Sequence, residues 1–228
     1  MIELRRRPGE FARVGHRGAS ALAPENTISA LELAVDLGCD MLEFDVFELL
    51  DGTLVLAHDT RAVRRSESAL VVLDDALAFC AATLPGIGLQ VDVKRRGIER
   101  GVVDALRRHG VLERSWVSSF DAASLRRFAE LEPDLPRSYT FPRTRWRTRT
   151  VGASLPERVP LLLARSRATA ITPHFSVASP AAIARAHELG APVYVWTVDD
   201  PNVAEGLVRD GVDGIITNDP RIFATLKT

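Results

Sequence analysis

The stretch SPAAIARAHELGAPVYVWTVDDPNVAEGLVRDGVDGIITNDP, residues 179–220, carries the pattern that decides the fold. Two short runs rich in β-branched residues alternate here with helical segments whose ends are clearly marked. Ser179–Pro180 is a typical helix start, a capping hydroxyl followed by a first-turn proline, and Gly190 is a typical helix end. Asp200–Pro201 and Asp219–Pro220 repeat the start signal. This order predicts parallel strands joined by crossover helices.

The same alternation extends over almost the whole chain of 228 residues. Eight runs are predicted strands: 12–18, 40–49, 88–94, 116–120, 137–141, 168–173, 193–198 and 214–218. Helical patterns separate most of them. In the first predicted helix, Ile28, Leu31 and Val35 share one face, and Gly38 marks its end. Asp121 can cap a later helix.

Eight strands and about eight crossover helices predict an α/β fold, a single (β/α)8 TIM-type barrel. The rival is an open doubly wound sheet, but the GxGxxG fingerprint is missing after the first strand. A DG turn at Asp51–Gly52 predicts a hairpin that interrupts the regular alternation. No repeat or linker divides the sequence, so we expect residues 1–228 to form one catalytic domain.

The composition excludes several classes of function. The formal net charge is −1, so no global basic field indicates a nucleic-acid partner. No stretch approaches the roughly 20 apolar residues of a membrane span, and the charged N-terminus is not followed by an apolar signal region. We therefore expect a cytoplasmic protein without stable membrane insertion. Cys39 and Cys80 are too few for a disulfide framework and are expected to be buried thiols.

Acidic residues alternate along two predicted strands. In DMLEFDV, Glu43 and Asp45 are two residues apart and share a face with Met41, whereas the intervening apolar residues face the helices. In GLQVDVK the same alternation points Gln90, Asp92 and Lys94 into the barrel. Each carboxylate alone is also consistent with a salt bridge at the barrel mouth. Together, three converging carboxylates suit a hard divalent ion, Mg²⁺ or Ca²⁺, and Lys94 suits a phosphate oxygen.

Two histidines end strand segments near these carboxylates. His16 and Arg17 end the first predicted strand, and His58 and Asp59 end the segment after the DG turn. A lone histidine is more often a packing or capping residue than a catalyst. Two histidines beside a carboxylate triad indicate an acid/base pair, because barrel enzymes keep their chemistry at the C-terminal strand ends.

The chain also carries a set of motifs in a fixed order. They are HRGAS (16–20), APENT (23–27), ELAVDLGCDMLEFDV (32–46), DGTLVLAHD (51–59), VDVK (91–94), VWTVDDP (195–201) and DGIITNDP (213–220). With these motifs, residues 14 to 220 resemble the glycerophosphodiester phosphodiesterase family. The resemblance implies a metal-dependent phosphodiesterase acting on small phosphodiesters and releasing glycerol 3-phosphate and an alcohol.

The resemblance also implies roles for individual residues. His16 and His58 match the general acid/base pair, and the resemblance does not say which of them is the acid. Asp59 lies beside His58 and could hold it protonated, which favours His58 as the acid. Glu43, Asp45 and Asp92 match the metal ligands. Substrate contacts are implied for Arg17, Lys94 and Trp196.

The sequence departs from the family pattern at three points, of which Asp92 bears on the metal and the short segment after His58 bears on the substrate. Asp92 stands where Glu is usual, and Asn218 where many members have Asp. The segment from His58 to Asp92 is short, so the small insertion after the second strand is expected to be reduced and the site more open. A lysophospholipase D-type activity on lyso-lipids therefore stays an alternative. A further alternative is a non-catalytic barrel that binds phosphoesters. The sequence disfavours it, because both histidines and all three carboxylates that match the family are present.

Other polar residues are expected to be structural. His109 lies near a helix C-terminus and His187 on an outer helix, whereas His174 follows a strand on the catalytic side and is left open as a substrate contact. The arginine-rich run FPRTRWRTRT (141–150) is expected to be a solvated loop, with an anionic head group or membrane surface as the minority alternative.

Overall fold

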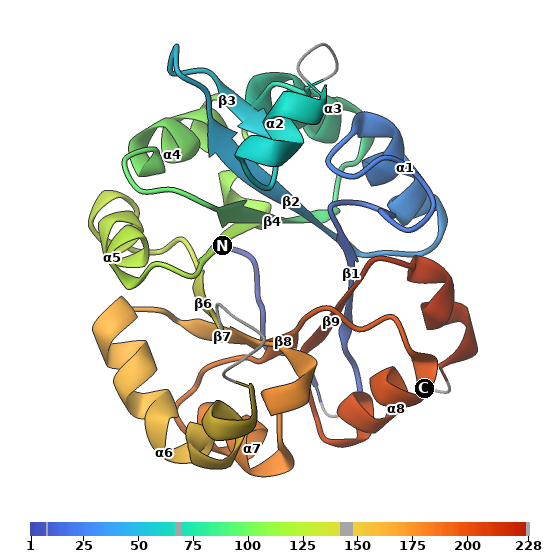
Figure 1. The fold of residues 1–228 in the computed structure, drawn as a ribbon, viewed down its shortest axis with the longest axis vertical. Helices are drawn as coiled ribbons and strands as arrows, with labels where there is room; N and C mark the ends of the chain where they lie inside the picture. Colours follow the sequence, from blue (N-terminus) through green and yellow to red (C-terminus); the bar gives the residue numbers. More distant parts are fainter. Residues whose placement is uncertain (8, 67–69, 142–147, 227–228) are drawn as a thin grey trace.

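The computed structural model describes residues 1–7, 9–66, 70–141 and 148–226. Eight parallel strands surround one axis, and helices pack outside them (Figure 1). The parallel strands are β1 Ala12–His16, β2 Met41–Glu48, β4 Gly88–Val93, β5 Ser115–Ser119, β6 Arg137–Phe141, β7 Ala170–Pro173, β8 Tyr194–Val195 and β9 Gly214–Thr217. Their order is β7-β6-β5-β4-β2-β1-β9-β8. Parallel bridges Ile171–Val193 and His174–Trp196 join β7 to β8. The predicted (β/α)8 barrel is confirmed, and it is nearly closed.

The helices end close to the predicted signals. They are α1 Ile28–Asp36, α2 Thr60–Ser66, α3 Leu73–Thr83, α4 Glu99–Arg108, α5 Ala122–Leu131, α6 Thr148–Ser166, α7 Pro180–Glu188 and α8 Pro201–Arg209. Asp121, Ser179 and Asp200 accept hydrogen bonds from the first turns of α5, α7 and α8, as predicted. Asp219 also caps, but the segment Pro220–Thr225 that follows is a 3-10 helix.

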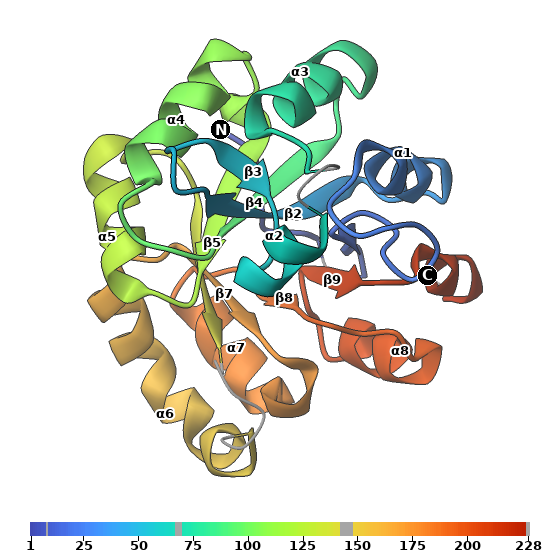
Figure 2. The same cartoon turned by 45° about the horizontal axis from the view of Figure 1, so that its top comes forward.

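The hairpin predicted at the DG turn is present. Strand β3, Leu54–Leu56, pairs antiparallel with β2, and the Leu49 amide bonds the carbonyl of Thr53 across the turn. Between β3 and β4 the described chain forms only α2 and α3. Both views place α2 beside β2 and β3, at the edge of the barrel (Figures 1 and 2).

The predicted first strand stops at His16 instead of continuing to Gly18. Arg17 and Gly18 have φ values of 56° and 76°, a left-handed conformation that a strand cannot contain. A Cβ on Gly18 would lie 2.4 Å from the Ala30 carbonyl, so glycine is required for this loop to pack on α1. The loop then turns Arg17 towards β2.

The interior of the barrel is divided into two halves. The lower half, away from the C-terminal ends of the strands, is apolar and contains Leu4, Met41, Trp116 and Tyr194. The Tyr194 hydroxyl donates to the Leu4 carbonyl. A second and larger apolar cluster lies between the outer face of the strands and the helices, and it includes Phe44. The predicted inward and outward faces of β2 are therefore confirmed. The upper half of the interior is polar, and this half forms the site.

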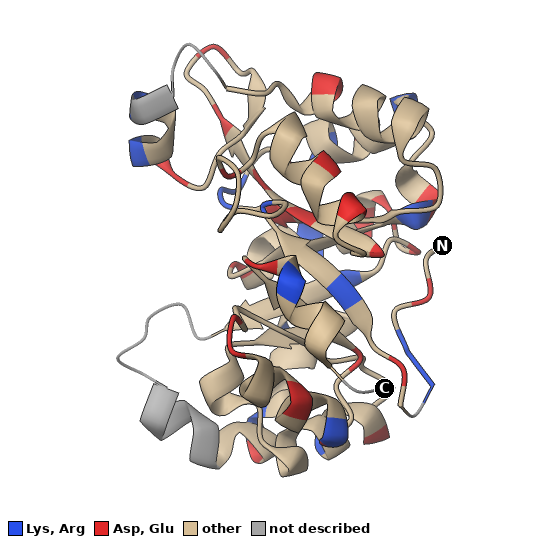
Figure 3. Ribbon diagram, turned by 90° about the vertical axis from the view of Figure 1, so that its right-hand side faces the viewer, with Lys and Arg blue, Asp and Glu red and all other residues tan. Residues whose placement is uncertain are grey.

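Charged residues of both signs are interspersed along the ribbon (Figure 3). The described helices include none with the length and apolar character needed to span a bilayer.

Candidate active site

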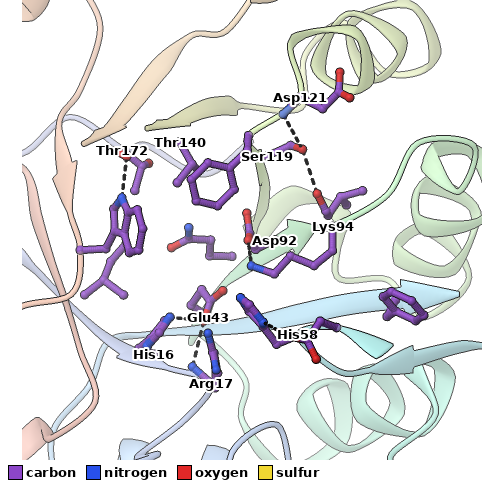
Figure 4. Close-up of a pocket in the computed structure, with 17 residues that line it drawn as sticks. His16, Arg17, Glu43, His58, Asp92, Lys94, Ser119, Asp121, Thr140 and Thr172 are labelled. Atoms are coloured by element: carbon purple, nitrogen blue, oxygen red, sulfur yellow. Dashed lines mark hydrogen bonds and ion pairs between the residues drawn. The ribbon is translucent and has the colours of Figure 1, made fainter. Parts of the chain in front are cut away.

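A pocket of about 420 Å³ opens at the C-terminal ends of the strands (Figure 4). All but one of the site residues predicted from the sequence line it, and the exception, Asp45, is buried behind the wall. The lining residues are His16, Arg17, Glu43, Phe47, His58, Asp59, Gln90, Asp92, Val93, Lys94, Ser119, Phe120, Asp121, Thr140, Thr172, Trp196 and Ile216. The predicted convergence of these residues is thus present, while their roles stay predictions.

Three carboxylates meet in the pocket wall. Glu43 and Asp45 project from β2, and Asp92 from β4 is the direct register partner of Asp45. One oxygen from each lies within 4.8 Å of the others, and all three residues are buried. The site residue that sequence reasoning missed is Asn26, whose amide donates to Asp45 Oδ2 at 3.0 Å and accepts from its backbone N–H. Its position in the APENT motif was the available signal.

Two cations lie against these carboxylates. The Lys94 ammonium is 2.6 Å from Asp45 Oδ1 and also contacts Asp92 Oδ2. The Arg17 Nε lies 2.9 Å from Asp45 Oδ2, and the Arg17 backbone N–H donates to Glu43. Both cations were predicted to contact phosphate; in the structure their direct partners are carboxylates.

The charges of the cluster are unevenly distributed. Burial, and next the charge of Asp45, raise the pKa of Glu43 well above its usual range. Burial alone would also raise the pKa of Asp45, but Lys94 and Arg17 outweigh it and lower that pKa. Burial would lower the pKa of Lys94, and Asp45 and Asp92 raise it instead. The three buried carboxyl groups offer oxygen ligands, and Glu43 has too little positive charge around it to be stable as a carboxylate. A hard divalent cation fits both features.

His16 is held in one orientation by a relay of hydrogen bonds. Its Nδ1 lies 2.6 Å from Asn218 Oδ1, and the Asn218 amide donates to Asp199 Oδ2 at 2.7 Å. Because a carboxylate only accepts, Asn218 must present its oxygen to His16, so Nδ1 carries the proton. Nε2 then faces Glu43 Oε2 at 3.9 Å with a free lone pair. Burial, followed by the charge of Arg17, lowers the pKa of His16 to about 4. His16 is thereby arranged as a neutral proton acceptor.

His58 lies on another side of the pocket and is more exposed (Figure 4). Its Nδ1 is 3.3 Å from Asp59 Oδ2, the contact expected from their adjacency. Asp59 also accepts from the Ala62 and Arg61 backbone N–H groups at the start of α2. The Ala62 hydrogen bond, and then His58, lower the pKa of Asp59. The anchored carboxylate therefore holds the Nδ1 side of the His58 ring.

Phe120 and Trp196 form an aromatic wall of the pocket. The indole of Trp196 donates to the Thr172 carbonyl at 3.0 Å and meets Phe120 edge to face at 5.6 Å. His174 packs against Trp196 and is not among the lining residues, and the substrate contact left open for it stays untested.

The remaining expectations are mostly structural. His109 and His187 bond Asp74 and Asp213, away from the pocket, as predicted. Cys39 and Cys80 are free and buried, and burial raises the pKa of their thiols to about 12 and about 11. Residues 142–147 of the arginine-rich run lie outside the described residues.

Comparisons with known proteins point to one family. The model of the Glycerophosphoryl diester phosphodiesterase family matches residues 16–78 and 87–222. The YhdW protein of Bacillus subtilis is 30% identical over 236 residues, which cover 91% of this chain and 94% of YhdW. A glycerophosphodiester phosphodiesterase of Caldanaerobacter subterraneus subsp. tengcongensis is 28% identical over 244 residues, covering 93% and 96%. A phosphodiesterase of Oleispira antarctica, solved with the product sn-glycerol-3-phosphate, superposes with a TM-score of 0.77 at 22% identity, covering 94% and 95%.

Proposed function

Since the chain belongs to the glycerophosphoryl diester phosphodiesterase family, a family of phosphoric diester hydrolases, we propose that it hydrolyses glycerophosphodiesters with a divalent cation and two histidines. The products would be glycerol 3-phosphate and a small alcohol. The observation that carries the proposal is the meeting of three buried carboxylates and two histidines in one pocket. The product seen in the Oleispira antarctica phosphodiesterase supports the substrate class.

The metal would be held by Glu43, Asp45 and Asp92. When bound, Mg²⁺ or Ca²⁺ supplies positive charge for the non-bridging oxygens of the phosphodiester. The carboxylates provide only oxygen ligands, which both ions prefer. Lys94 and Arg17, already directed at this cluster, add fixed positive charge and orient the phosphate.

The hydrogen bonds of the two histidines support a division of roles. His16 presents a lone pair on Nε2, so it takes the proton of the nucleophile. His58, beside the Asp59 carboxylate, protonates the departing oxygen. The nucleophile is either water or the neighbouring 2-hydroxyl of the substrate, which would give a cyclic phosphate first. Trp196 forms the wall against which the substrate packs.

The extent of the catalytic unit is also a proposal. One hydrophobic cluster includes residues from Phe11 to Phe223, which supports a single catalytic domain over residues 1–228.

The decisive experiment measures choline and glycerol 3-phosphate released from glycerophosphocholine, with chelator and with Mg²⁺ or Ca²⁺. We expect metal-dependent release of both products and little activity in Glu43→Gln. Lysophosphatidylcholine is assayed in parallel, since faster turnover of the lyso-lipid would establish the lysophospholipase D-type alternative. Binding of glycerol 3-phosphate without turnover of either substrate would contradict the proposal and identify a phosphoester-binding barrel.

A further inference from the structure

Two buried polar side-chain atoms of the pocket lining have neither a hydrogen-bond nor an ion-pair partner within the described part of the chain. They are Gln90 Oε1 and Thr140 Oγ1. Both residues line the pocket and are almost fully buried, with 2% and 6% of their surface exposed. A buried polar atom without a partner costs about 1–3 kcal/mol. Two such atoms in one wall therefore indicate that a ligand completes their hydrogen bonds.

The orientation of the Gln90 amide is fixed by its neighbours. Gln90 Nε2 donates to Ser118 Oγ at 3.0 Å, and the Ser118 hydroxyl donates to Asp92 Oδ1 at 2.6 Å. Because the Ser118 hydrogen is directed to the carboxylate, a flipped Gln90 amide would place two acceptors against each other. Gln90 Oε1 is consequently held as an acceptor that needs a donor from the pocket.

Thr140 is isolated for a related reason. Its register partner on β7 is Thr172, whose hydroxyl is already bonded to Ser138. The Thr140 hydroxyl can therefore both donate to and accept from a ligand. Figure 4 shows Thr140 and Thr172 on the side of the pocket away from His58.

We propose that Gln90 and Thr140 form a subsite for the hydroxyl groups of the glycerol moiety and determine the preference for polyol phosphodiesters. This inference rests on the proposed function and assigns one half of the substrate to one side of the pocket. Gln90 Oε1 accepts a hydrogen bond, which a hydroxyl can donate. The phosphodiester monoanion and a choline trimethylammonium group have no hydrogen to donate, so neither satisfies this position.

The arrangement also orients the rest of the substrate. With glycerol on the side of Thr140, the phosphate lies towards Lys94 and the carboxylates, and the released alcohol lies towards His58. This agrees with His58 as the donor of the proton to the departing oxygen. The subsite would therefore select both the substrate and the bond that breaks.

The test uses Thr140→Val, which removes the hydroxyl at nearly constant shape, and Gln90→Met. In Mg²⁺-loaded enzyme, kcat/KM is measured for glycerophosphocholine and for bis(p-nitrophenyl) phosphate, which has no hydroxyl group. We expect the ratio of the two values to fall about tenfold in each variant, the loss of roughly one hydrogen bond. Binding of glycerol 3-phosphate, measured by calorimetry, should weaken relative to that of inorganic phosphate.

Thr172→Val is the matched control, because Thr172 lines the same pocket and its hydroxyl already bonds Ser138. It should lower the melting temperature and leave the substrate ratio unchanged, whereas Thr140→Val should change the ratio without lowering the melting temperature. Equal losses on both substrates in Thr140→Val and Gln90→Met would overturn the subsite. Failure of wild-type enzyme to hydrolyse glycerophosphocholine would instead refute the proposed function itself.

Discussion

Replacing Lys94 with Met should destabilise the protein strongly once divalent metal is removed. The Lys94 side chain is only 13% exposed, and its ammonium contacts both Asp45 and Asp92. Methionine retains most of the length of the side chain and removes only the charge. In chelator, Asp45 would keep Arg17 as its cation, and Asp92 would lose its only ionic partner among the described residues. Removing one member of a buried ion pair costs about 3–5 kcal/mol.

The expected effect is large enough to measure by thermal unfolding. For a chain of this size, 1 kcal/mol shifts the melting temperature by about 2–4 °C, so Lys94→Met should melt roughly 6–20 °C below wild type in chelator. A divalent cation bound by the same carboxylates would supply the missing charge. Millimolar Mg²⁺ or Ca²⁺ should therefore raise the melting temperature of Lys94→Met more than that of wild type.

Arg96→Met is the matched control, because it removes a neighbouring cation whose side chain is 66% exposed and paired with Asp121. An exposed pair contributes about 0–1 kcal/mol, so this variant should melt close to wild type in both buffers. The reasoning is refuted if Lys94→Met behaves like Arg96→Met in chelator. It is also refuted if metal stabilises Lys94→Met and wild type by the same amount.

Three further predictions concern catalysis and pH. Chelation should abolish diesterase activity, and Glu43→Ala should cost more than Asp92→Ala, whose shorter side chain suits binding through water; full activity in stripped enzyme would exclude the metal site. His58→Ala should damage hydrolysis of glycerophosphocholine far more than that of a p-nitrophenyl diester, whereas His16→Ala should lower kcat on both by about 10²–10⁴-fold; the opposite pattern would reverse the two roles. The pKa of His16, about 4 when folded and about 6.5 when unfolded, means that only the unfolded chain takes up this proton between those values. Metal-free wild type should therefore lose up to about 3 kcal/mol of stability relative to His16→Gln as the pH falls through this window. The free energy of unfolding is measured by urea denaturation at each pH, and the same pH dependence in both proteins would contradict the prediction.

The barrel could be predicted because its signals are local. Each of the eight predicted strands overlaps an observed one, and the caps at Asp121, Ser179 and Asp200 depend only on neighbouring residues. The errors occur where tertiary contacts decide. Arg17 and Gly18 take left-handed conformations, and Gly18 packs on the Ala30 carbonyl. Neither this contact nor the end of the strand at His16 is visible in the local pattern.

The site was predictable only at the level of which strand ends meet. Alternation along β2 and β4 is enough to bring Glu43, Asp45 and Asp92 together. The partners of these residues were not predictable, because Asn26 reaches Asp45 and Asp199 reaches Asn218 through side-chain rotamers and loop paths. The carboxylate contacts of Lys94 were missed for the same reason: the spacing places the side chain inside the barrel but does not choose between a carboxylate and a phosphate.

The two halves of the barrel interior differ in what their buried side chains contribute to stability. In the lower half, Trp116, Tyr194 and Met41 fill the space with apolar packing. The upper half, built from the same strands, buries Asp45 with charged partners and leaves the Thr140 hydroxyl without a hydrogen-bond partner among the described residues. Apolar residues of similar volume would stabilise this half, since buried polar groups are costly unless their partners are supplied. A ligand that supplies charge and hydrogen bonds to these groups binds the folded form better than the unfolded chain, so metal and polyol phosphate, if bound as proposed above, would stabilise the fold.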